Sequence, residues 1–220
     1  MAPATIECRG PYLIAHFGEP QTCVSWAVVN GGRVRSSRVA WYYVNDSETG
    51  LLHDPGAFLR NKLAHAELSD AVGLMTSRKR YGHVETLASY EGQRAWCLAT
   101  VGLRNSLRIG DVPITEPSAA TINLVCWVSE ALSIEAGLEA MAMAAEARTT
   151  AMLGASIPSI VSGLPATGTG TDCIAIAHPT HGMPCQYAGK HTGIGHLIGK
   201  CVHEAISEGI REWVTEFGLP

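Results

Sequence analysis

The chain has 220 residues, of which 46% are hydrophobic and 16% charged, and its formal net charge is −4. This composition provides enough apolar residues for a core and excludes a disordered chain. The acidic balance disfavours a nucleic-acid binder, which usually carries a basic stripe. No apolar run is long enough to cross a bilayer, and Met1-Ala2-Pro3 does not open a signal peptide. We therefore expect a single cytoplasmic domain over residues 1–220 that contacts neither nucleic acid nor membrane.

The seven cysteines are scattered along the chain, odd in number, and include no CxxC pair. This usage is typical of a reduced protein. Cys126, Cys173 and Cys201 stand in apolar stretches and are expected in the core. Cys185 stands in a loop and is the thiol to test for reactivity, which requires an exposed, electropositive setting.

The first hundred residues have the pattern of paired strands. Apolar runs at 12–17, 22–29 and 33–44 are separated by turn residues at Gly18-Glu19-Pro20 and Asn30-Gly31-Gly32. An Asn-Gly step between apolar runs favours a hairpin. Further elements are expected in this part: a helix at 55–65, a buried strand at 72–76, and a second hairpin with strands at 83–90 and 93–101 around Glu91-Gly92.

The segment Thr100–Asp111 is predicted to be a strand end followed by a polar loop, and such loops often carry binding groups. Arg104 and Arg108 could hold a phosphate or a carboxylate, and Asn105 could donate a hydrogen bond to an oxyanion. The alternative is a surface turn with two exposed arginines.

The middle of the chain predicts a strand and then a helix. Thr121–Val128 is continuously apolar, which favours a central strand. Ser133 can cap a helix that ends at Gly154. One face of this helix is expected to be an apolar stripe formed by Ile134, Leu138, Met141, Ala145, Thr149 and Met152. Glu146 lies off that stripe, and we expect it on a solvated face more than in a site.

The stretch Ala166–Asp172 combines three threonines, two glycines and an aspartate just before an apolar strand at 173–177. If it is extended, Thr167, Thr169 and Thr171 share one face. Glycines let a ligand approach the backbone, and their N–H groups can line an anion-binding hollow. The segment is therefore either part of a site or a polar turn that precedes the strand.

A long amphipathic helix is predicted to begin near Thr192 and to end at Gly218. Lys190 and His191 would then lie at its N-terminus, where free N–H groups favour negative charge. His196 and His203 are seven residues apart instead of the usual four, and no Cys/His cluster accompanies them, so no metal site is expected.

Several of these segments resemble the adenosylcobinamide amidohydrolase family of cobamide salvage. The resemblance implies hydrolysis of the amide between aminopropanol and the corrin ring, giving adenosylcobyric acid. Cobalt would then be part of the corrinoid substrate, and no cofactor is implied. The matching segments cover about residues 70–210 and are Thr100–Asp111, Thr121–Asn123, Glu146–Ala151, Ala166–Asp172 and Tyr187–Thr192.

Ala120-Thr121 before an apolar strand is also similar to the nucleophile segment of the DmpA aminopeptidase and ornithine acetyltransferase group. That similarity implies that Thr121 attacks an amide, commonly after the chain cleaves itself before this residue. It also implies a four-layer α/β/β/α fold. From the pattern of elements we expect layered α/β (α+β) architecture, with mostly antiparallel sheets covered by two long helices.

Amide hydrolysis needs a nucleophile, a base and donors to an oxyanion. The catalytic candidates are Thr121 as nucleophile, Asp172 as base or orienting group, His191 as a competing base and Lys190 as an oxyanion donor. Two alternatives remain open: an amidase for a non-corrinoid substrate, and a non-catalytic binder of a corrinoid or nucleotide. Whether the chain forms a homo-oligomer is also open. The substrate-binding candidates are Arg104, Asn105, Asn123, Thr167, Thr169 and Thr171.

Overall fold

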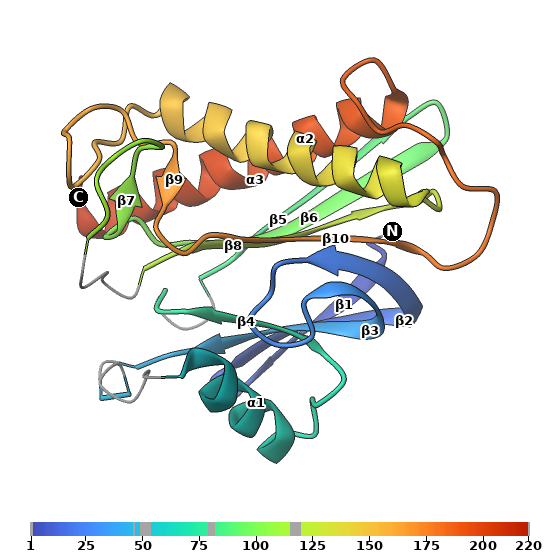
Figure 1. Ribbon diagram of the computed structural model, residues 1–220, viewed down its shortest axis with the longest axis horizontal. Coiled ribbons are helices and arrows are strands. Elements are labelled where there is room, and N and C mark those ends of the chain that lie inside the picture. The colour runs from blue at the N-terminus through green and yellow to red at the C-terminus, as the bar shows by residue number, and fades with distance from the viewer. Residues whose placement is uncertain (1, 46, 49–53, 79–81, 115–119, 220) are drawn as a thin grey trace.

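The protein is described here from a computed structural model that covers residues 2–45, 47–48, 54–78, 82–114 and 120–219. Figure 1 shows its helices and strands in layers. In chain order the elements are β1 (Ala4–Arg9), β2 (Tyr12–Ser25), β3 (Gly32–Tyr43), α1 (Pro55–His65), β4 (Val72–Thr76), β5 (Val84–Tyr90), β6 (Gln93–Val101), β7 (Ser106–Leu107), β8 (Ile122–Val128), α2 (Ile134–Gly154), β9 (Gly168–Thr169), β10 (Cys173–Pro179) and α3 (Gly193–Phe217).

Eight strands form one sheet with the order β4-β3-β2-β10-β8-β6-β5, and β1 pairs with β2. Two of its neighbouring pairs, β10–β8 and β3–β4, are parallel, and the others are antiparallel. The short strands β7 and β9 pair separately beside it. The mostly antiparallel sheet is as predicted, and the continuously apolar β8 is central, with every residue buried.

The sheet folds over itself, so that the protein has four layers (Figure 1). One core lies between the pair α2 and α3 and the strands β5, β6, β8 and β10. A second core lies between the other face of β6, β8 and β10 and the strands β1, β2, β3 and β4. A third lies between β2, β3 and β4 and the helix α1, where Leu59 and Leu63 are fully buried. The predicted α/β/β/α layering is confirmed.

Strand β2 belongs to both sheet layers because it changes register in its middle. Its pairing with β3 shifts between His16 and Gln21, which is a β-bulge or irregularity. Bulges bend a strand and increase its twist. The second part of β2, Gln21–Ser25, pairs with β10. The turn predicted at Gly18-Glu19-Pro20 is therefore wrong, because these residues continue the strand at its bend.

Local sequence signals set the second hairpin and the last helix as predicted. Glu91 and Gly92 have φ of 48° and 82°, the positive values that a tight hairpin turn of type I′ requires. The Thr192 side chain caps α3 by accepting a hydrogen bond from the Gly195 N–H at 2.9 Å, and α3 ends at Gly218. None of the helices in the described ranges is both long and apolar enough to cross a membrane.

Helix α2 spans the predicted residues but buries a different face. Ile134 and Leu138, expected in the apolar stripe, are 61% and 62% exposed. The buried face is made of small residues that include Ala136, Ala140 and Ala144. Small side chains let α2 lie close to α3 and to β10, and it contacts both. The predicted stripe is wrong at Ile134 and Leu138, where small residues take the buried face, whereas Met152 is fully buried and Met141 and Ala145 pack partly buried against the core.

The seven cysteines are all free thiols. Cys126, Cys173 and Cys201 are buried in the core, as predicted. Cys185 is only partly buried, but burial and the nearby Glu130 carboxylate raise the pKa of its thiol. Its setting is therefore not the electropositive one that activates a cysteine.

Candidate active site

The Thr/Gly stretch turns tightly so that its own aspartate receives four hydrogen-bond donors. The Asp172 carboxylate accepts from the Ile122 N–H at 3.1 Å and from the Thr169 N–H at 3.1 Å. It also accepts from the Thr169 hydroxyl and from the Arg148 guanidinium. This carboxylate therefore joins the end of β9, the start of β8 and α2.

The Arg148–Asp172 ion pair is buried, with side chains that are 15% and 8% exposed. Burial raises the pKa of Asp172, while the Arg148 charge and the hydrogen bonds from Thr169 and Ile122 oppose that rise. A Cβ at Gly168 would overlap both the guanidinium and the carboxylate. Glycine at this position is thus what lets the pair form beside the backbone. Asp172 fits the orienting role predicted for it better than that of a base, since donors already surround it.

Thr121 lies directly before β8, and its side chain faces the space between the two sheet layers. It is 6% exposed, and its hydroxyl donates to Asn123 Oδ1 at 3.3 Å. The Asn123 amide nitrogen donates in turn to the Met75 carbonyl of β4, in the facing layer. The Thr121 carbonyl accepts from the Gly102 N–H at 3.0 Å. Both the backbone and the hydroxyl of Thr121 are therefore held in place.

Thr100 places a further hydroxyl next to Asn123, the hydrogen-bond partner of Thr121. It is fully buried in β6, and its Oγ1 has no hydrogen-bond partner among the described residues. It is the cross-strand partner of Asn123, so both side chains stand on the same face of the sheet. A buried hydroxyl without a partner costs free energy, which a bound ligand can recover.

Asn105 is a second buried polar side chain whose nitrogen and oxygen have no partner in the described parts of the chain. Its backbone carbonyl accepts from the Gly170 N–H at 3.1 Å. A Cβ at Gly170 would lie 2.7 Å from the Asn105 amide nitrogen. Both glycines of the Thr/Gly stretch therefore allow a close approach by the protein's own side chains, in place of the ligand that the sequence suggested.

The other predicted substrate-binding residues are dispersed. Thr167 accepts from the Ile109 N–H at 2.8 Å, and Thr171 is exposed, so the predicted shared face of the threonines does not form. The Arg104 guanidinium lies 5.5 Å from the Phe217 ring centroid, at the end of α3. Arg108 donates to the Pro165 carbonyl at 2.7 Å, which ties it to a loop.

Lys190 and His191 do not join Thr121, and the predicted convergence is wrong for both. Gly193, the first residue of α3, lies against Gln93 and Tyr90. Strand pairing places that hairpin tip beside Val128, at the other end of β8 from Thr121. Seven strand residues separate the two ends by roughly 20 Å. Lys190 forms an ion pair with Glu146, in keeping with the solvated position expected of that glutamate.

Three contributors to the site were not predicted from the sequence. The sequence gives no reason to place Arg148 in a site, because charged helix residues are mostly exposed. The Trp26 indole donates to the Asp172 carbonyl at 2.7 Å, a contact between residues 146 positions apart. Thr100 has no local signal of its own beyond its place in a strand. Arg148 and Thr100 both stand inside segments on which the family resemblance rests, Glu146–Ala151 and Thr100–Asp111.

No metal-ligand cluster is evident in the part of the chain that the structure describes. There, no group of three or more His, Cys, Asp or Glu side chains is placed to hold an ion. The His196 ring packs against the Tyr90 ring, with centroids 5.3 Å apart.

The class of protein follows from the comparison with known families. A family model described as adenosylcobinamide amidohydrolase matches residues 2–217. The chain belongs to this amidohydrolase family. No curated protein gives a significant match.

Two solved structures are similar in overall fold. A Burkholderia sp. beta-aminopeptidase is 12% identical with a TM-score of 0.44, over 94% of this chain and 82% of that one. The PH0078 protein from Pyrococcus horikoshii OT3 is 11% identical with a TM-score of 0.44, over 98% of this chain and 80% of that one.

Proposed function

We propose that the protein hydrolyses the amide between aminopropanol and the corrin ring of adenosylcobinamide, releasing aminopropanol and adenosylcobyric acid. The family match over residues 2–217 supports this substrate. The observation that carries the chemistry is the held hydroxyl of Thr121, 3.3 Å from Asn123 Oδ1. The cobalt ion belongs to the corrinoid substrate in this proposal, and the protein's own groups act on the amide.

Thr121 is the proposed nucleophile. Its Oγ1 adds to the amide carbon, the C–N bond breaks, and aminopropanol leaves with a proton, so that the corrin carboxyl is held as an ester on Thr121. Water then hydrolyses the ester and restores the hydroxyl. Asn123 orients the attacking oxygen, and the Met75 carbonyl fixes the Asn123 amide. Such an oriented nucleophile still needs a base.

The proposed base is the α-amino group of Thr121 itself. The Asn123 amide oxygen is too weak a base at neutral pH, Asp172 is already bonded to four donors, and His191 is at the other end of β8. Attack of Thr121 Oγ1 on the Ala120 carbonyl carbon would break the peptide bond between the two residues and free this amine, and hydrolysis of the resulting ester would release the Ala120 carboxylate and restore the Thr121 hydroxyl. An α-amine has a pKa of about 7.7–8.0, close to the ideal for a base at neutral pH.

Thr100 is the proposed additional donor to the oxyanion. Its buried hydroxyl, which has no partner among the described residues, stands beside Asn123 on the same face of the sheet. A preorganised donor of this kind stabilises charge that develops in the transition state. Thr100→Val keeps the shape of the side chain and removes the donor, and is expected to lower kcat by about 10²–10³-fold with little change in stability.

The substrate is tested by incubating the purified protein with adenosylcobinamide and following aminopropanol and adenosylcobyric acid by mass spectrometry. Release of both products supports the proposal. Tight corrinoid binding without release would identify a binding protein. If the protein neither binds nor cleaves adenosylcobinamide, its amide hydrolase activity acts on another substrate.

Self-cleavage is tested separately by the intact mass of the protein. The expected result is a chain with a new N-terminus at Thr121, which the Thr121→Ala variant does not produce. A wild-type chain that stays intact and is fully active would remove the α-amine as base and leave Thr121 dependent on another group.

A further inference from the structure

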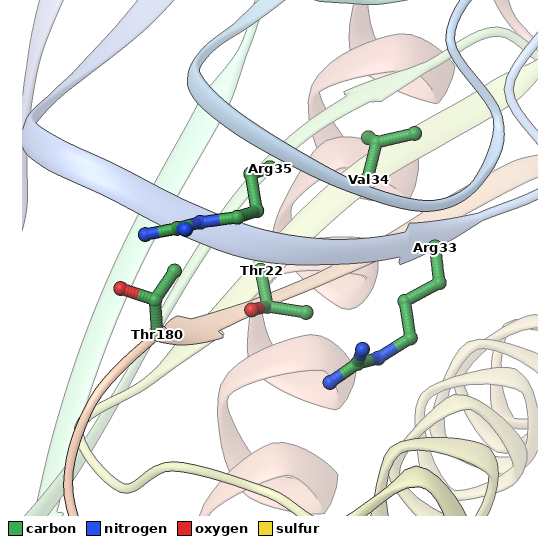
Figure 2. Close-up of a pocket in the computed structure, with 5 residues that line it drawn as sticks. All are labelled: Thr22, Arg33, Val34, Arg35 and Thr180. Carbon is green, nitrogen blue, oxygen red and sulfur yellow. The ribbon is translucent and has the colours of Figure 1, made fainter.

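A small polar pocket lies far from Thr121, beside the end of β10. Its volume is about 230 Å³, and it is lined by Thr22, Arg33, Val34, Arg35 and Thr180 (Figure 2). Sites for drug-sized ligands usually measure about 300–1,000 Å³. This pocket therefore fits a small group, or one end of a larger molecule.

Strand register explains why the polar side chains meet. Arg33 and Arg35 alternate along β3 with Val34, which packs toward the core between the sheet layers. Thr22 is the direct cross-strand partner of Arg35, so the two side chains share a face. Figure 2 shows Thr22 between the two arginines, with the Arg35 guanidinium pointing toward Thr180. This part of β3 extends beyond β4, which pairs only with residues 39–43.

The pocket carries positive charge that is not balanced locally. Among the described residues, the guanidiniums of Arg33 and Arg35 form no ion pair or side-chain hydrogen bond, whereas Arg38 and Arg148 are each paired with an aspartate. The lining contains no carboxylate. In a chain with a formal net charge of −4, the two guanidiniums therefore give this pocket a local positive charge. Charged residues on an edge strand can also serve only to prevent aggregation, but that role does not require a hollow or a buried threonine.

We propose that this pocket binds a phosphate group, either as free phosphate or as part of a phosphorylated small molecule. The guanidiniums of Arg33 and Arg35 and the hydroxyls of Thr22 and Thr180 would donate to its oxygens from several directions. Arginine suits this chemistry because its charged N–H groups match phosphate oxygens. The site is separate from amide hydrolysis, since the length of β10, roughly 20 Å, separates Thr180 from Asp172.

The test is titration of the full chain at low ionic strength with inorganic phosphate and with glycerol phosphate, followed by calorimetry and 31P NMR. The variants are Arg33→Gln, Arg35→Gln and their combination, with Thr180→Val as a variant that keeps both charges. Arg60→Gln is the matched control, because Arg60 is an exposed arginine on α1 outside the pocket. Thermal unfolding of each variant separates lost binding from lost structure.

The expected result is saturable binding with a Kd of about 1 mM or tighter. Each single arginine variant should raise Kd about tenfold, as the loss of one charge-assisted hydrogen bond does, while Arg60→Gln leaves it unchanged. Tighter binding of glycerol phosphate would identify a phosphorylated molecule as ligand, and tighter binding of inorganic phosphate would identify the free ion. Absence of binding by both ligands, or binding that survives in the folded double variant, would overturn the proposal. Neither outcome bears on aminopropanol release.

Discussion

Replacing Asp172 by asparagine tests whether this carboxylate holds the site together. The substitution removes the charge opposite the buried Arg148 guanidinium and places an amide N–H₂ among groups that donate. Breaking a buried ion pair by removing one partner costs about 3–5 kcal/mol. In a chain of this size, Tm falls by about 2–4 °C for each kcal/mol of lost stability, so this loss should lower Tm by roughly 6–20 °C.

The assay is urea and thermal unfolding of Asp172→Asn beside a matched control, Asp70→Asn. Asp70 pairs with Arg38 at the surface, where its side chain is 53% exposed, so the control should lose no more than about 1 kcal/mol. Adding Arg148→Met to Asp172→Asn should recover part of the loss, because the unpaired buried charge is then gone. A loss for Asp172→Asn as small as that of Asp70→Asn would refute the view that Asp172 ties β8, β9 and α2 together.

Three further predictions concern separate parts of the molecule. Gly168→Ala should destabilise the protein and reduce activity, because the added Cβ would overlap Arg148 and Asp172. In the control Gly199→Ala the added Cβ meets open space on α3, and the unfolding free energy should rise by up to about 1 kcal/mol. Equal effects of the two substitutions would contradict the crowding at Gly168. Burial lowers the pKa of His178, so its neutral form is favoured in the folded state, and stability should fall as pH drops below the unfolded-state pKa of about 6.5. His178→Asn should flatten that slope in urea titrations at several pH values. With a thiol reagent, exposed Cys8 should react first and Cys185 slowly; fast Cys185 labelling in the native protein would show an activated thiol.

Elements whose signals are local could be predicted from the sequence. The 3-and-4 spacing of α3, its Thr192 cap and its stop at Gly218 all specify one helix. The unbroken apolar run of β8 specified a strand buried on both faces. The buried face of α2 could not be predicted, because it depends on how closely α3 and the sheet approach, and this distance selects alanine over leucine.

The candidate site could be predicted only in part, because strand register decides which segments meet and no local signal shows that register. The resemblances and the Thr/Gly stretch point to Thr121, Asn123, Thr169 and Asp172, and the hydrogen bonds between their segments show that these lie together. His191 had an equally strong local signal at a helix N-terminus. Nothing in the sequence shows that this helix begins at the far end of β8, because that follows from the register of the β5–β6 hairpin.

The most direct test of the account is the turnover of adenosylcobinamide by Thr121→Ala and Thr121→Ser. If the Thr121 hydroxyl is the nucleophile, the alanine variant releases no aminopropanol above the uncatalysed rate, and the serine variant, which keeps a hydroxyl at this position, retains measurable release. Release by the folded alanine variant at the wild-type rate would contradict the account.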